Sequence, residues 1–154
     1  MVHGKMIRKA RLQDVKQIQA LINFFAKADL MLPRSLNELY ENLRDFWVCA
    51  ENRQIIGCVA LHVSWEDLAE IKSLAVKKNK QGKGIGSQLI KMCIEEAKGL
   101  GIKKMFALTF RPQLFKKFGF KKTRHSSLPH KIWAECINCH KFPNCQEIAL
   151  VKKI

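Results

Sequence analysis

A glycine-rich loop at residues 81–87, Gln-Gly-Lys-Gly-Ile-Gly-Ser, constrains the fold of this chain more than any other segment. It follows a strand-like run at 71–76 and precedes a segment with apolar residues at helical spacing: Ile85, Leu89, Met92, Cys93, Ala97 and Leu100. Free amides and the positive end of the helix dipole meet at such a helix start, and glycine leaves room for an anion. The segment therefore predicts a phosphate-binding strand, loop and helix.

The spacing of the loop narrows the class of ligand. A dinucleotide-binding fingerprint needs a third glycine at position 87, which is Ser, and a P-loop needs Gly-Lys followed by Ser or Thr, which does not occur. The remaining pattern is Gln-x-x-Gly-x-Gly, carried by Gln81, Gly84 and Gly86. It resembles the pyrophosphate-binding motif of the GNAT superfamily of N-acetyltransferases, which implies acetyl-CoA as the co-substrate. The loop by itself is also compatible with a plain tight turn.

The order of the other elements agrees with this resemblance. We predict strands at 5–11, 46–51, 54–64, 68–76, 104–110 and 147–152, with one more strand before the last, and helices that start near Asp14, Ser35, the glycine loop and Pro112. This order indicates an α/β (α+β) fold, a mixed six- to seven-stranded sheet with about four helices on both faces. Residues 1–154 are expected to form a single domain. In the superfamily, the fourth and fifth strands splay apart around acetyl-CoA.

The composition does not identify a binding partner, but it argues against a membrane-spanning or secreted protein. The net charge is +15, from 28 Lys and Arg against 13 Asp and Glu. Such a field attracts nucleic acid and coenzyme A alike. No run approaches the roughly 20 apolar residues of a membrane span, and the N-terminus lacks a signal-peptide core. We therefore expect a cytoplasmic protein without membrane contact; a homodimer is compatible with the sequence, which does not decide the oligomeric state.

Six cysteines form two groups. The first group lies in apolar runs, where a free thiol packs as a small hydrophobe: Cys49, Cys58 and Cys93. The second clusters in a polar loop at 134–146: Cys136, Cys139 and Cys145. With His130 or His140, the second group could bind a structural zinc. A redox-sensitive thiol cluster is another interpretation, and we favour a loop without metal because only one Cys-x-x-Cys pair is present.

The resemblance also implies which residues act in catalysis. Acetyl transfer needs a base for the ammonium and a donor of hydrogen bonds to the thioester oxygen. Glu70 lies near the start of the strand before the glycine loop, where a carboxylate could serve as the base, although such an acid is often a solvated cap. In the superfamily this strand is bulged, so that the Leu74 amide faces the thioester. The implied coenzyme site comprises Leu74, Ala75, Val76, Gln81, Gly82, Lys83, Gly84, Ile85, Gly86, Ser87 and Phe115.

Phe115 marks a departure from the superfamily pattern. Many members carry a Tyr four residues before a Gly-Phe pair and use it as the general acid, but residues 115–120 read Phe-Lys-Lys-Phe-Gly-Phe. Phenylalanine cannot donate a proton. The thiolate then takes a proton from elsewhere, such as water, or leaves unassisted, since thiols have a pKa of about 8.5. We expect Phe115 to pack beside the coenzyme.

Residues 32–35, 69–76 and 108–111 resemble the acetyltransferase domain of bacterial N-acetylglutamate synthases, which also lacks this Tyr. The resemblance implies a stand-alone short form that acetylates L-glutamate for arginine biosynthesis. Arg34, Lys72 and Arg111 would bind its two carboxylates, and the arginines suit them through their planar fork. The long synthases carry an Arg-x-Ser pattern where this chain has its cysteine loop. Alternative acceptors are a protein N-terminus, lysine or another small amine; a basic nucleic-acid-binding module is a remote alternative.

Overall fold

The computed structural model describes residues 4–128 and 147–154. One sheet contains seven strands: β1 Lys5–Lys9, β2 Phe46–Glu51, β3 Gln54–Trp65, β4 Leu68–Val76, β5 Lys104–Thr109, β6 Lys121–Thr123 and β7 Ile148–Lys153. The α-helices of this described part are α1 Val15–Ala26, α2 Leu36–Glu41, α3 Ile85–Leu100 and α4 Pro112–Lys116. The second cysteine group lies outside the described residues, so its zinc and loop interpretations stay predictions.

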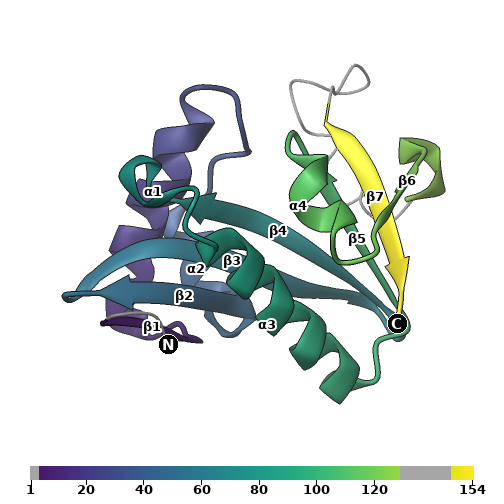
Figure 1. The fold of residues 1–154 in the computed structure, drawn as a ribbon. Coiled ribbons are helices and arrows are strands. Elements are labelled where there is room, and N and C mark those ends of the chain that lie inside the picture. Colours follow the sequence, from purple (N-terminus) through teal and green to yellow (C-terminus); the bar gives the residue numbers. More distant parts are fainter. Residues whose placement is uncertain (1–3, 129–146) are drawn as a thin grey trace.

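The sheet is mixed, as predicted, and its strands lie in the order β1-β2-β3-β4-β5-β7-β6. The first four form an antiparallel meander, β4 and β5 run parallel, and β7 pairs antiparallel with both β5 and β6. Figure 1 shows this path, with α3 as the crossover between the two parallel strands. The glycine loop therefore lies at the carboxyl end of β4, where α3 begins.

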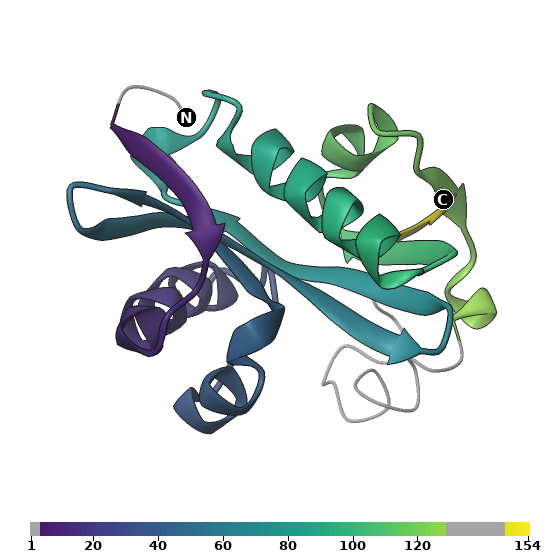
Figure 2. The same cartoon turned by 90° about the horizontal axis from the view of Figure 1, so that it is seen from below.

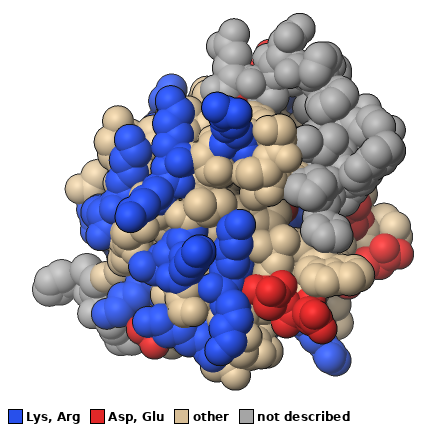
Figure 3. Space-filling view, turned by 90° about the vertical axis from the view of Figure 1, so that its right-hand side faces the viewer, with Lys and Arg blue, Asp and Glu red and all other residues tan. Residues whose placement is uncertain are grey.

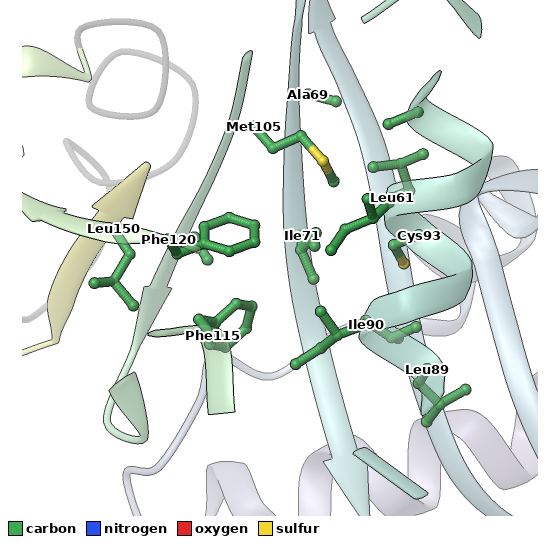
Figure 4. Close-up of a cluster of buried hydrophobic side chains, with 14 of the residues drawn as sticks. Leu61, Ala69, Ile71, Leu89, Ile90, Cys93, Met105, Phe115, Phe120 and Leu150 are labelled. Atoms are coloured by element: carbon green, nitrogen blue, oxygen red, sulfur yellow. The ribbon is translucent and has the colours of Figure 1, made fainter. Parts of the chain in front are cut away.

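Helices cover both faces of the sheet, with α3 and α4 on one face and α1 and α2 on the other (Figure 2). The larger core forms under α3, where Leu89, Ile90 and Cys93 pack against Ile71 and neighbouring strand residues (Figure 4). A second core lies under α1 and includes Cys58. Cys49, Cys58 and Cys93 are buried free thiols, which confirms that prediction.

Two local contacts explain where elements start and stop. β1 ends two residues earlier than predicted because Leu12–Asp14 forms a 3-10 turn. Asp14 Oδ2 accepts hydrogen bonds from the Arg11 amide at 2.8 Å and from Arg8 Nη1 at 2.7 Å, which holds that turn in place. At α2, the side chains of Ser35 and Glu38 form the predicted capping box.

One face of the fold carries many basic side chains. Figure 3 shows Lys and Arg concentrated on the side of the molecule that carries β6, β7 and α4. Exposed lysines on these elements are Lys116, Lys121, Lys122 and Lys153, and Lys117 directly follows α4. β6 is the edge strand of the sheet, and lysines on an edge discourage pairing with another chain. None of the helices in the described part of the chain has the length and hydropathy that a bilayer crossing requires.

Candidate active site

The parallel strands β4 and β5 pair over a short distance and then separate. Their ladder consists of Leu68↔Lys104, Ala69↔Met105 and Glu70↔Phe106. Beyond Glu70, β4 continues to Val76 while the strands diverge toward the glycine loop and α4 (Figure 1). A cavity of about 610 Å³ opens between them and is lined by both strands, the glycine loop, residues 30–32 and Arg34. This is the splayed arrangement that the resemblance predicted.

β4 carries a bulge on the cavity wall. In the β3–β4 ladder, Cys58 pairs with Ala75 and Ala60 with Lys72, so one residue of β3 faces Ser73 and Leu74 of β4. Ser73 has a φ of 57°, a left-handed conformation that is uncommon for residues other than glycine. A bulge of this kind turns main-chain groups away from the ladder. The bulge was expected near Leu74, but the strained Ser73 carries no sequence signal that would have identified it.

Glu70 lies deep in the site rather than at a solvated strand end. It is the third residue of β4, pairs with both neighbouring strands and is only 4% exposed. It lines the cavity at the point where β4 and β5 part. A carboxylate in this position can reach a bound amine while being shielded from bulk water.

The glycine loop presents the start of α3 to the cavity. Gly84 is the N-cap of α3 with a φ of 83°, and Gly82 has a φ of 77°. A Cβ added at either glycine would meet no atom within 4 Å, so the space in front of the loop is open. The first bond of the helix ladder runs from the Gln88 amide to the Gly84 carbonyl, so the amides of Ile85 and Gly86 precede that ladder. They can bind a phosphate oxygen.

Gln81 ties together the ends of the two diverging strands. Its Nε2 donates to the Val76 carbonyl at 3.0 Å, and its Oε1 accepts from Arg111 Nη2 at 3.3 Å. Arg111 was predicted to bind the acceptor, but this hydrogen bond places its guanidinium at the glycine-loop end of the cavity. The side-chain amide of Gln81 therefore orients a cation at the same end of the cavity as the α3 amides that can bind a phosphate.

Arg34 and Lys72 line the same cavity as Glu70. The Arg34 main chain is anchored to α1, because its amide donates to Asn23 Oδ1 at 3.2 Å and its carbonyl accepts from Gln19 Nε2 at 3.2 Å. The Arg34 side chain is 11% exposed and lies 3.4 Å from Glu38 Oε2. This cation is thus held in a defined place before any ligand arrives.

Phe115 and Lys83 differ in how they relate to the cavity. Phe115 is buried, packs edge-to-face on Phe120 with ring centroids 5.4 Å apart, and also lines the cavity. Lys83 is exposed and does not line the cavity.

Lys80, which the sequence did not single out from a lysine-rich stretch, lines the cavity, and its ammonium group lies 2.7 Å from Glu51 Oε1. This hydrogen bond from Lys80 lowers the pKa of Glu51, against an opposing effect of desolvation and with further attraction to the charges of Lys80, Lys5 and Lys83.

The described residues contain no cluster of three or more His, Cys, Asp or Glu side chains that could hold a metal ion. The cavity itself is lined by the carboxylate of Glu70, several cationic side chains and the main chain around the bulge and the glycine loop. This combination suits transfer from a phosphate-bearing donor to a charged acceptor.

Comparisons with known proteins agree with this geometry. An uncharacterized N-acetyltransferase from Chlorobaculum tepidum is 38% identical over 96% of this chain and 96% of its own length. An amino-acid acetyltransferase from Mycobacterium tuberculosis is 32% identical over 84% of this chain and 76% of its own. Amino-acid acetyltransferases from Neisseria meningitidis match over 80% of this chain, which spans only 29% of their length.

Solved structures show the same fold. Rv2747 from Mycobacterium tuberculosis, in a complex with CoA, has a TM-score of 0.83 at 27% identity, over 97% of this chain and 99% of that one. N-acetylglutamate synthase from Neisseria gonorrhoeae, complexed with coenzyme A and N-acetyl-glutamate, has a TM-score of 0.87 at 27% identity, over 99% of this chain and 36% of that one. Residues 12–120 match the model of the acetyltransferase (GNAT) family. The chain therefore belongs to the GNAT family of acetyltransferases.

Proposed function

We propose that this acetyltransferase moves the acetyl group of acetyl-CoA to the α-amine of L-glutamate, directly and in a ternary complex. The observation that carries the proposal is one cavity lined by the buried Glu70, the two cations Arg34 and Lys72, and the bulge at Ser73. The names of the relatives, amino-acid acetyltransferase and N-acetylglutamate synthase, support the same acceptor. The product would enter arginine biosynthesis in the cytoplasm.

The donor would lie along β4. Its pyrophosphate binds the first amides of α3, with Arg111 and Lys80 close to the phosphates, and its pantetheine arm follows the main chain from Val76 back to the bulge. The thioester then lies between Leu74 and Glu70. Phe115 packs beside the coenzyme from α4, which is consistent with its place on the cavity wall.

Glu70 would accept a proton from the ammonium of the acceptor, which gives the neutral amine that attacks the thioester carbon. The Leu74 amide donates a hydrogen bond to the oxyanion that forms, and main-chain donors in such a position lower the barrier without reorganisation. The C–S bond then breaks. Phe115 has no proton to give, so the thiolate leaves as the anion or takes a proton from water.

Glutamate carries two carboxylates, and two cations line the acceptor end of the cavity. Arg34 is preorganised by its main-chain contacts with α1, whereas Lys72 projects from β4 two residues beyond Glu70. We assign these two residues to the acceptor and Arg111 to the coenzyme end, because Arg111 is hydrogen bonded to Gln81. A neutral or cationic acceptor would bring no carboxylate to these two cations.

The test is a panel of amino acids and small amines with acetyl-CoA, in which release of free thiol is measured. Glutamate should exceed glutamine by about 10-fold or more in kcat/KM, since a hydrogen bond to a charged group contributes about 1.5–3 kcal/mol. Arg34→Gln should raise KM for glutamate by a similar factor, and Arg124→Gln, on exposed surface, serves as its control. Equal rates with glutamate and glutamine would exclude the pocket for two carboxylates.

A further inference from the structure

A histidine lies beside Glu70 on the neighbouring strand. His62 of β3 is directly opposite Glu70 in the antiparallel β3–β4 ladder. Residues directly opposite each other point to the same face of a sheet, with Cβ atoms about 4.5–5.5 Å apart. Leu61 and Ile71, the adjacent opposite pair, pack in the core under α3, while Ala60 packs in the core under α1. His62 and Glu70 are therefore neighbours on the face that carries α1 and α2.

Asp45 orients the ring of His62. β2 pairs with β3 only as far as Ala60, and the 3-10 turn η2, Leu43–Asp45, lies beside β3 beyond that point. Asp45 Oδ2 lies 2.7 Å from His62 Nδ1. An ionised carboxylate accepts hydrogen bonds but cannot donate them, so Nδ1 carries the proton and Nε2 is left as the basic nitrogen.

His62 and Glu70 differ in their exposure to solvent. Glu70 is 4% exposed and lines the cavity, whereas the His62 side chain is 38% exposed and does not line it. A buried base must return each proton to bulk water before it can act again, and imidazole is the side chain that exchanges protons most readily near neutral pH. On β4 and η2, the two elements that adjoin His62 here, the other charged residues are Lys72 of β4 and the exposed Arg44 of η2.

We propose that His62, oriented by Asp45, carries the proton of Glu70 to solvent after each acetyl transfer. The O–H bond of the protonated Glu70 carboxyl breaks and an N–H bond forms at His62 Nε2. The resulting imidazolium is stabilised by the Asp45 carboxylate and releases the proton to water, which restores a neutral imidazole and an ionised Glu70. His62 does not touch the substrates and acts through Glu70. The inference rests on the proposed role of Glu70 as the base.

His62→Gln tests the relay, because glutamine keeps a polar side chain but has no group that takes up a proton near neutral pH. We expect kcat to fall about tenfold, within the usual contribution of a proton-transfer group, with both KM values unchanged. Added imidazole should restore most of the lost kcat, which a purely structural role would not allow. Asp45→Asn should cause a smaller loss with the same recovery. Val63→Gln, at the next position of the same strand on its other face, is the control and should match the wild type.

Free-thiol release is measured with the best acceptor from the panel, so the test does not depend on glutamate. The relay would be overturned if His62→Gln had the kcat of the wild type, or if imidazole did not restore its lowered kcat. Glu70→Gln separates this result from a failure of the proposed function. If Glu70→Gln loses activity while His62→Gln does not, only the relay is wrong; if Glu70→Gln keeps wild-type turnover, the base itself is wrong. Should His62→Gln not fold, the response of Asp45→Asn to imidazole decides the question.

Discussion

Replacing Gly84 with Ala tests whether the start of α3 holds the coenzyme. Gly84 caps this helix with a φ of 83°, and an added Cβ would meet no protein atom within 4 Å. The new methyl group would instead occupy the space before the amides of Ile85 and Gly86, where we place the pyrophosphate. Gly101 caps the other end of the same helix with a φ of 86° and the same freedom from contacts, so Gly101→Ala is a matched control.

The two variants should lose the same stability without ligand. A left-handed conformation costs an L-residue about 1–2 kcal/mol. Alanine also lowers the conformational entropy of the unfolded chain, which offsets part of this cost, so we expect the free energy of unfolding to fall by about 1 kcal/mol. In a chain of this size that loss lowers Tm by about 2–4 °C. Acetyl-CoA at 100 times its Kd should add about 2.7 kcal/mol to the free energy of unfolding of the wild type, about 5–11 °C in Tm.

Thermal unfolding over a series of acetyl-CoA concentrations separates the two effects. Gly101→Ala should keep the full increase in Tm with ligand, and Gly84→Ala should lose most of it. An unchanged increase in Gly84→Ala would refute the assignment of the phosphate site to this loop. If acetyl-CoA does not raise the Tm of the wild type at all, the chain does not bind this donor.

Two further predictions concern buried groups outside the cavity. Burial alone would raise the pKa of Asp14, but hydrogen bonds from the Arg8 guanidinium and the Arg11 amide outweigh it and lower that pKa. Asp14→Asn should therefore cost about 2–3 kcal/mol at neutral pH. In urea unfolding, the difference in free energy of unfolding between Asp14→Asn and the wild type should shrink as the pH falls below about 4. A difference that stays constant with pH would contradict this reasoning. Burial raises the pKa of Cys58 to about 12, so an alkylating reagent should label it only in unfolded protein, which peptide mass spectrometry can check.

The sequence predicted most elements because their capping and turn residues indicate the same bounds as the spacing of their apolar residues. Residues 46–51 and 68–76 form strands within the predicted bounds, and the Ser35 capping box starts α2 as expected. β6 was expected without bounds, since its three residues, mostly exposed lysines, show no apolar alternation. β1 ends early because the contacts of Asp14 with Arg8 and Arg11 are a matter of three-dimensional structure rather than of strand propensity.

The candidate functional residues also fall into two groups: those that local spacing identifies and those whose position depends on the three-dimensional fold. Glycine spacing identified the loop before α3, but the placement of charged residues depends on the whole fold. Glu70 is buried because three strands meet around it, whereas an isolated carboxylate in a sequence is usually exposed. Arg111 lies beside Gln81, which is 30 residues away in sequence. His62 could be linked to Glu70 only once the register of β3 and β4 was known.

In the proposed function, the cavity binds the donor mainly through main-chain atoms and the acceptor through side chains, and this has a consequence for the evolution of new enzymes. At the coenzyme end, most of the proposed contacts come from the main chain of β4 and of the first turn of α3, so a sequence that keeps this backbone should keep most of them. At the acceptor end they come from side chains such as Arg34 and Lys72. Because β4 and β5 pair only as far as Glu70, these side chains can be exchanged without breaking the ladder. A duplicated gene could acquire a new acceptor in few steps while it retains its fold and its donor.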